Sequence, residues 1–194
     1  MDARVQDVID AVTAEGERHD ADEPDRLKRW RVLEPEAGRL VWFLVHLVKA
    51  RDIVEIGTAH GVSTLWLAEA ARTTGGQVRS VDLDLDAQAV ALRHLTTAGL
   101  ADQVRFVVGD GGALLAGVPD DSVDLLFLDA ERTEYPGWWP HPVRVLRPGG
   151  VLIADNARSH PSEIAPLRRL IEQDSRLVTT TLDTGKGALV ATRI

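Results

Sequence analysis

The chain has 194 residues, of which 44% are hydrophobic and 27% charged, and this size and composition fit one globular domain with a full core. Its net charge of −8 argues against broad binding to a nucleic-acid backbone, which requires a basic face. The sequence has no cysteine, which excludes disulfides, thiolate catalysis and cysteine-ligated zinc.

The chain opens without an apolar signal core, and its longest apolar stretch, Leu40–Val48, is interrupted by His46 and too short to span a bilayer. We therefore expect a cytoplasmic protein without a membrane partner. One local basic cluster stands out against the acidic balance: Arg26, Lys28, Arg29 and Arg31. The cluster could form a local basic patch, but a solvated helix face is the interpretation we favour.

Apolar spacing predicts a first helix from Asp2 to about Glu17, followed by a charged loop at Arg18–Asp25. Pro35 occupies a tolerated early position in a second helix that runs to about Lys49. Strands and helices then alternate. The expected strands are Asp52–Ile56, Gln77–Asp82, Val104–Val108, Val123–Asp129 and Val151–Asp155, and the expected helices are Val62–Arg72, Asp86–Ala98, a short one near Ala113, Trp138–Leu146 and Ser162–Gln173.

Two last strands, Leu177–Leu182 and Ala188–Thr192, are joined by a glycine-containing turn that predicts an antiparallel hairpin. The five preceding strand–helix units predict an α/β fold with a mostly parallel, seven-stranded sheet and helices on both faces. We expect a single domain over residues 1–194. Residues 1–50 form N-terminal helices that could act as a lid, and residues 51–194 form the core.

Polar side chains follow two of the buried strands: Asp129 after one, and Asp155 with Asn156 after the other. The carboxyl ends of parallel strands line the ligand crevice in such sheets, so neighbouring strands would bring these groups together. Two carboxylates about 4 Å apart repel by roughly 4 kcal/mol at an effective dielectric near 20. An all-oxygen set of this kind suits Mg²⁺ or Ca²⁺. Each acid alone could instead cap a helix or turn.

A glycine turn joins the first strand to its helix, with Gly57 suited to a tight turn and Gly61 to close approach at the helix start. The full dinucleotide fingerprint is absent because position 59 is Ala, which disfavours a dinucleotide oxidoreductase. Acids at strand ends strengthen a nucleotide interpretation: Glu55 within the first strand, Asp82 ending the second and Gly109-Asp110 ending the third.

These features resemble the class I S-adenosylmethionine-dependent methyltransferases, specifically the small metal-dependent O-methyltransferases similar to catechol and caffeoyl-CoA O-methyltransferases. The resemblance covers roughly Leu33 to the C-terminus and implies a Rossmann-like core. The strings that carry it are Val54-Glu-Ile-Gly-Thr-Ala-His-Gly-Val-Ser-Thr64, Ser80-Val-Asp-Leu-Asp84, Val107-Val-Gly-Asp110, Phe127-Leu-Asp-Ala130, Leu146-Arg-Pro-Gly-Gly-Val-Leu-Ile-Ala-Asp-Asn156 and Thr181-Leu-Asp-Thr-Gly-Lys-Gly-Ala-Leu-Val190.

The resemblance implies that Asp129, Asp155 and Asn156 hold a divalent cation, most often Mg²⁺. The cation would lower the pKa of an acceptor hydroxyl that then displaces the methyl group in line. By the same resemblance Asp82 would hold the ribose hydroxyls and Asp110 would lie near the adenine. The full set of residues implied for S-adenosylmethionine is Glu55, Gly57, Thr58, Gly61, Ser63, Asp82, Leu83, Gly109, Asp110 and Asp129.

The sequence departs from the family where relatives commonly carry a lysine that serves as general base, because Arg132 stands there. Arginine is effectively never deprotonated, so it could only orient an anionic group or stabilise a developing oxyanion, or remain a solvated charge. His160 is the best substitute base, since histidine titrates near neutral pH, and His60 and His141 are further candidates. We therefore expect Asp129, Arg132 and His160 to act in catalysis.

Some of the tryptophans could line the binding site of an aromatic acceptor. Trp138 and Trp139 are expected at a helix start, one packed beneath the sheet and one facing the acceptor, and Trp30 and Trp42 would contribute if the N-terminal helices form a lid. The sequence thus predicts an O-methyltransferase acting on a small hydroxylated, aromatic or natural-product acceptor. The alternatives are a metal-independent small-molecule methyltransferase, a tRNA hydroxyuridine methyltransferase, which the acidic charge disfavours, and an inactive cofactor-binding domain. Family relatives also suggest a homodimer.

Overall fold

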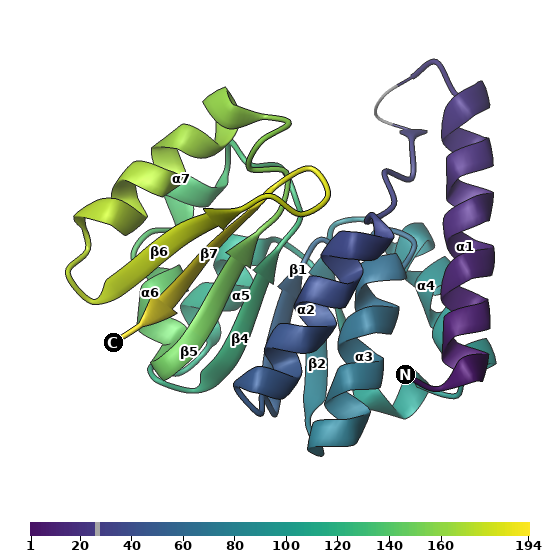
Figure 1. Ribbon diagram of the computed structural model, residues 1–194, viewed down its shortest axis with the longest axis horizontal. Helices are drawn as coiled ribbons and strands as arrows, with labels where there is room; N and C mark the ends of the chain where they lie inside the picture. Colours follow the sequence, from purple (N-terminus) through teal and green to yellow (C-terminus); the bar gives the residue numbers. More distant parts are fainter. Residues whose placement is uncertain (26–27) are drawn as a thin grey trace.

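The fold is a seven-stranded sheet in the order β3-β2-β1-β4-β5-β7-β6, seen in a computed structural model that describes residues 1–25 and 28–194 (Figure 1). Strands β1 to β5 pair in parallel, and β7 runs antiparallel to both β5 and β6. The α/β class, the mostly parallel sheet and the closing hairpin are therefore confirmed. The strands are β1 (Asp52–Ile56), β2 (Gln77–Asp82), β3 (Val104–Val108), β4 (Val123–Leu128), β5 (Leu146–Ala154), β6 (Leu177–Leu182) and β7 (Ala188–Arg193).

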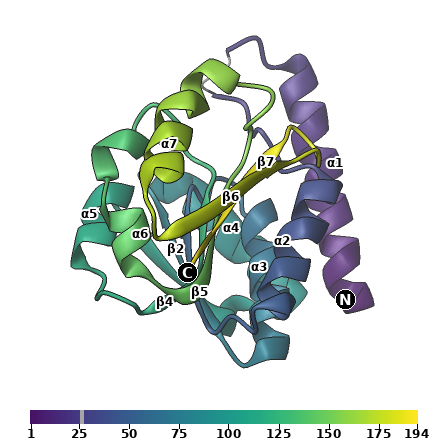
Figure 2. The same ribbon diagram turned by 60° about the vertical axis from the view of Figure 1, so that its left-hand side comes forward.

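Helices cover both faces of the sheet, as the two views in Figures 1 and 2 show. On one face lie α1 (Ala3–Asp22), α2 (Pro35–Leu47), α3 (Val62–Thr74) and α4 (Leu85–Ala98), and on the other α5 (Gly111–Gly117), α6 (His141–Val145) and α7 (Pro161–Gln173). Short 3-10 helices also occur at η2 (Ala101–Gln103) and η3 (Tyr135–Trp138). Within the described residues, none of these helices combines the length and the apolar character needed to cross a membrane.

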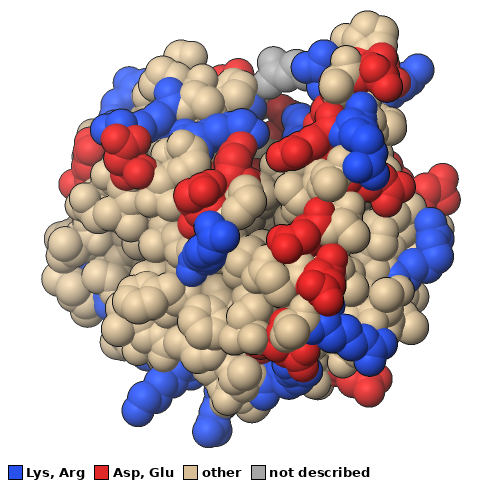
Figure 3. Space-filling view, turned by 45° about the vertical axis from the view of Figure 1, so that its right-hand side comes forward, with Lys and Arg blue, Asp and Glu red and all other residues tan. Residues whose placement is uncertain are grey.

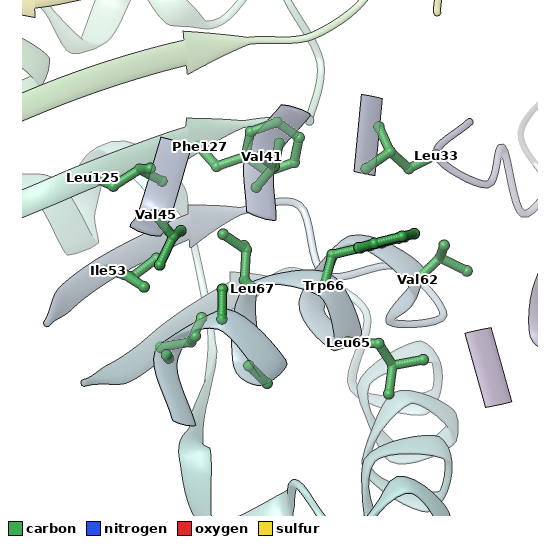
Figure 4. Packing of buried hydrophobic residues seen from close by; sticks show 14 of the residues in the cluster. Leu33, Val41, Val45, Ile53, Val62, Leu65, Trp66, Leu67, Leu125 and Phe127 are labelled. Atoms are coloured by element: carbon green, nitrogen blue, oxygen red, sulfur yellow. The ribbon is translucent and has the colours of Figure 1, made fainter. Parts of the chain in front are cut away.

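The side-chain alternation of the strands divides the core in two. In β4, Leu125 and Phe127 face α2 and α3, whereas Leu126 and Leu128 face the layer of α5 to α7. Figure 4 shows Phe127 and Leu125 beside Val41 and Val45 of α2, with Trp66 and Leu67 of α3 nearby. Because both faces are buried, the central strands are almost entirely apolar.

Three expected boundaries were wrong. Helix α1 continues to Asp22, so most of the predicted loop at Arg18–Asp25 is helical, because Pro24 is the first residue able to stop it. The predicted helix Trp138–Leu146 is replaced by η3 and the short α6, since prolines at 136, 140 and 142 interrupt a continuous helix. Strand β5 begins at Leu146, five residues early, and the register shift between Val123 and Leu125 accommodates the extension.

The basic cluster was also misinterpreted. Arg29 and Arg31 lie in irregular backbone between α1 and α2, Lys28 beside them has 3-10 geometry, and Arg26 lies outside the described residues. Trp30 belongs to the same irregular segment, whereas Trp42 lies in α2 as expected and donates its indole N–H to the buried Glu69 on α3. Among the described residues, this segment therefore contributes no α-helical face.

Replacing Gly38 with Ala is predicted to destabilise the protein. A Cβ at Gly38 would lie 2.3 Å from Nε1 of Trp66, a ring buried between α2 and α3. We expect a loss of about 1–3 kcal/mol in the free energy of unfolding, measured by urea denaturation, because overpacking must shift that ring. Gly117 at the end of α5 has nothing within 4 Å of an added Cβ and provides the matched control. Equal effects of Gly38→Ala and Gly117→Ala would contradict this packing.

Candidate active site

The parallel register brings three loop starts to one edge of the sheet. Ile56 pairs with Leu128, and Leu128 pairs with Ala154, so Gly57, Asp129 and Asp155 follow at the same level. Backbone hydrogen bonds extend this alignment beyond the strands, from Asp129 N to Ile56 O at 2.9 Å and from Asp155 N to Leu128 O at 3.1 Å. The polar ends of β1, β4 and β5 therefore form one continuous floor.

A cavity of about 690 Å³ lies over this floor, within the size range of small-molecule and cofactor sites. Its walls include most of the residues predicted for function: Gly57, Asp82, Leu83, Gly109, Asp110, Asp129, Arg132, Asp155, Asn156 and His160. Thr58, Gly61 and Ser63 line a small adjoining recess, and Glu55 lies behind the floor without reaching either space. Trp30, Trp138 and Lys186 are among the other residues that line the larger cavity.

The loop after β1 is shaped by two glycines in left-handed conformations. Gly57 has φ +104, and a Cβ there would lie 2.2 Å from the carbonyl oxygen of Asp129. Gly61 has φ +87 and approaches Ala91 of α4 so closely that a Cβ would lie 2.7 Å from its methyl group. Both positions disfavour side chains, because each has a positive φ and the space for a Cβ is filled, by the Asp129 carbonyl at Gly57 and by Ala91 at Gly61.

Acidic side chains at the ends of β2 and β3 face the cavity. Asp82 accepts a hydrogen bond from Ala59 N at 2.8 Å and another from Asp84 N at 3.0 Å, which fixes its carboxylate against the loop after β1. Asp110 caps α5 by accepting from Ala113 N at 2.7 Å, and Gly109 N donates to Asp82 O. This side of the cavity is therefore acidic and rich in acceptors.

Glu55 is fully buried behind the loop after β1. Its Oε2 accepts hydrogen bonds from the hydroxyls of Thr64 and Ser80, each at 2.6 Å. Burial raises the pKa of Glu55 to about 7, although the hydroxyls of Ser63, Ser80 and Thr64 favour the charged form. Glu55 of β1 is thus hydrogen-bonded to both α3 and β2.

Asp129, Asp155 and Asn156 converge as the sequence predicted. The Asn156 amide donates to Asp129 Oδ1 at 3.3 Å and to Asp155 Oδ2 at 3.0 Å, so one side chain bridges both carboxylates. Asn156 adopts φ +64, a left-handed conformation that asparagine tolerates better than most residues. Among the described residues no three His, Cys, Asp or Glu side chains lie close enough together to hold a metal ion. A cation site at this position would therefore need the side-chain amide of Asn156 as a third ligand.

The two carboxylates are poorly compensated. Burial, the charge of Asp155 and the charge of Glu55 raise the pKa of Asp129 well above its usual range. Burial also raises the pKa of Asp155 to about 6, against the opposing effect of its backbone hydrogen bond. Clustered carboxylates with raised pKa values are typical of functional sites, because a ligand or ion supplies the missing charge.

Arg132 and His160 both face the cavity. Arg132 is only 4% exposed, and its Nε donates to Glu163 of α7 at 2.8 Å, with Nη2 2.7 Å from the same oxygen. His160 precedes α7, and its Nδ1 lies 2.9 Å from the hydroxyl of Ser159. His141 contacts Arg144 instead and does not line the cavity, whereas His60 does.

Lys186 is a cavity residue that the sequence reasoning missed, whereas Trp30 and Trp138, which the sequence singled out as possible wall residues, do line the cavity. Lys186, in the turn of the β6–β7 hairpin, forms an ion pair with Glu34 at the start of α2. Trp30 stacks on His60 with ring centroids 3.9 Å apart and planes 5° from parallel. Trp138, 7% exposed, packs against Gly111 and Gly112 and also walls the cavity. Trp42 does not reach the cavity, and Trp139 packs partly buried against the α5–α7 side.

Comparisons with known proteins identify relatives of this chain among O-methyltransferases. A family model described as O-methyltransferase matches residues 20–194. A protein of Mycolicibacterium vanbaalenii, provisionally named an O-methyltransferase, is 34% identical over 174 residues, which cover 83% of this chain and 76% of that protein.

Solved structures agree in fold. The O-methyltransferase TomG from Streptomyces achromogenes, involved in tomaymycin synthesis and crystallised with S-adenosylmethionine, is 25% identical with a TM-score of 0.76, covering 100% of this chain and 90% of TomG. A methyltransferase from Geobacter sulfurreducens is also 25% identical, with a TM-score of 0.78 and coverage of 100% and 99%.

Glu55 makes a pH-dependent contribution to stability. Its folded pKa of about 7 exceeds the ordinary 4.5, so between these values the folded state binds more protons and the free energy of unfolding falls as pH rises. Glu55→Gln removes the ionisable group and with it this contribution to the pH dependence of the free energy of unfolding. The free energy of unfolding of the variant, relative to wild type, should therefore increase by on the order of 2–3 kcal/mol between pH 5 and pH 8.

Urea denaturation at several pH values measures this difference, and Asp129 and Asp155 titrate in both proteins and so largely cancel. A difference between variant and wild type that does not change with pH would contradict the description of Glu55 as a buried acid with a raised pKa.

Proposed function

Because the chain belongs to the O-methyltransferase family, we propose that it transfers the methyl group of S-adenosylmethionine to a hydroxyl of a small acceptor, with assistance from a divalent cation. The observation that carries the proposal is the convergence of Asp129, Asp155 and Asn156 beside a loop built on Gly57, all within one cavity.

S-adenosylmethionine would occupy the acidic side of the cavity. The cofactor carries a sulfonium and an ammonium, and the acids at the ends of β2 and β3 complement that positive charge. Asp82, fixed by two backbone N–H donors, presents a carboxylate to ribose hydroxyls, while Gly57 and Gly61 let the backbone approach the ligand closely.

Asp129, Asp155 and Asn156 would hold the cation. Two carboxylates with raised pKa values, of which that of Asp155 is buried, and an adjacent amide oxygen form a hard-oxygen set that suits Mg²⁺. When bound, such an ion acidifies a nearby acceptor hydroxyl and orients it. With the ion present, Asn156 would turn its oxygen rather than its N–H toward the site.

The transfer itself needs no protein nucleophile. The acceptor oxygen forms a bond to the methyl carbon, the carbon–sulfur bond breaks with its electron pair going to sulfur, and the hydroxyl proton must leave. His160 is the base we assign to that proton, since it lines the cavity on the loop after Asn156. Arg132, permanently charged and held by Glu163, would stabilise negative charge on the oxygen.

The acceptor would lie between the cation site and two aromatic walls. Trp138 packs over the glycines of α5, and Trp30 is held in place by its stack on His60. Flat walls of this kind favour an aromatic acceptor.

Metal dependence is testable on two readouts. We expect EDTA to abolish methyl transfer and Mg²⁺ to restore it, and Asp155→Asn to lower kcat/KM about 100-fold or more because a ligand of the cation is lost. Mg²⁺ should raise the Tm of wild type but not of Asp155→Asn. Glu131→Gln, at an exposed acid that also lines the cavity, is the matched control and should respond like wild type. Full activity in EDTA would instead favour a metal-independent methyltransferase.

The role of His160 predicts a change in the pH–rate profile. His160→Ala should lower kcat most near neutral pH and approach wild type at alkaline pH, where hydroxide replaces the base. His141→Ala removes a histidine outside the cavity and should leave the profile unchanged. A His160→Ala profile that matches wild type would exclude His160 as the base.

A further inference from the structure

The segment that joins α1 to α2 places positive charge at the mouth of the cavity. We call residues 28–32 the basic strap, because three of its five residues are cations that line the cavity: Lys28, Arg29 and Arg31. We propose that the acceptor carries an anionic group in addition to its reacting hydroxyl, and that the basic strap binds this group. The inference rests on the proposed function and names its substrate class.

The strap is fixed across the cavity. The Asp20 carboxylate of α1 accepts from Trp30 N at 2.7 Å and from Arg31 N at 2.8 Å, and Trp30 stacks on His60 of the loop after β1. Arg31 has φ +50, a strained conformation that these contacts hold in place. Figure 1 shows the segment on the same side of the molecule as the carboxyl ends of the parallel strands.

The cations of the strap are weakly neutralised. Arg31 pairs with Glu131 at 3.2 Å, but both side chains are about half exposed, so the pair contributes little. Arg29 donates to the carbonyl oxygen of Glu23, which carries no charge. The ammonium of Lys28 has neither a hydrogen bond nor an ion pair with any described residue. An anionic ligand would therefore find available charge here.

Charge is segregated within the cavity. Asp82, Asp84 and Asp110 line the side assigned to the positively charged cofactor, and Asp129 with Asp155 would be offset by the cation. The strap borders two loops, the loop after β1 through the stack of Trp30 on His60 and the loop after β4 through the pair of Arg31 with Glu131. Through Arg31 its positive charge reaches the loop that also contains Arg132, on the side assigned to the acceptor.

A small anion fits this arrangement better than RNA. The chain has a net charge of −8, and the strap is a local feature of five residues. Figure 3 shows Lys and Arg side chains gathered along the top of one face, with Asp and Glu side chains scattered down its middle. An RNA surface would need an extended basic face, which this one does not provide.

The test compares acceptors that differ in one charge. Binding of 3,4-dihydroxybenzoate and of its neutral amide to wild type loaded with S-adenosylhomocysteine and Mg²⁺ is measured by calorimetry, alongside methyl transfer to each. The carboxylate should bind more tightly, and added salt should weaken it selectively. In Lys28→Gln/Arg29→Gln, affinity for the carboxylate should fall about tenfold while the amide is unaffected.

Arg93→Gln/Arg105→Gln removes the same charge from exposed positions on α4 and β3 that do not line the cavity, and should behave as wild type. Equal binding of carboxylate and amide, or equal losses in both double variants, would overturn the proposal. So would weaker S-adenosylhomocysteine binding in the strap variant, which would assign the strap to the cofactor carboxylate. Competition by bulk tRNA that depends on the strap would assign it to RNA.

The same measurements distinguish failure of the anion specificity from failure of the proposed methyl transfer. Neutral and anionic acceptors methylated equally would leave the proposed function intact and remove the anion specificity. Absence of methyl transfer to any hydroxylated acceptor, despite cofactor binding, would instead contradict the proposed function.

Discussion

The in-register pairing of parallel strands is the constraint on which this molecule depends. Because Ile56, Leu128 and Ala154 are aligned across β1, β4 and β5, the next residue of each strand emerges at one height. The backbone hydrogen bonds of Asp129 and Asp155 to the preceding strand preserve that alignment into the loops. A shift of one residue would turn these side chains to the opposite face and separate the carboxylates.

Bringing the carboxylates of Asp129 and Asp155 together has an electrostatic cost. Asp129 and Asp155 are bridged by the neutral amide of Asn156, and burial raises both pKa values. A bound cation would offset the repulsion, so the unfavourable arrangement is best understood as preparation for a ligand. Under the proposed function, the acids at the ends of β2 and β3 and the basic strap would likewise be matched in charge to different ligands.

Local sequence signals predicted the parts of the site that lie at strand ends. Each of these signals spans only a few residues of sequence: the apolar runs that end in Asp129 and in Asp155-Asn156, and the glycines at 57 and 61. Strands β1 to β3 also matched their expected bounds. Contacts between distant segments gave no such signal. The stack of Trp30 on His60 and the pair of Lys186 with Glu34 arise only once α1, α2 and the hairpin are packed on the sheet. The roles of the site residues in catalysis stay predictions.

The central claim is that the cavity holds cofactor and cation side by side on the floor formed by β1, β4 and β5. A crystal structure with S-adenosylhomocysteine and Mn²⁺, using the anomalous signal of manganese, tests it most directly. The account predicts an anomalous peak in direct contact with oxygens of Asp129, Asp155 and Asn156, with the ribose hydroxyls on Asp82. Cofactor density away from Asp82, or no manganese peak between the two carboxylates, would contradict it.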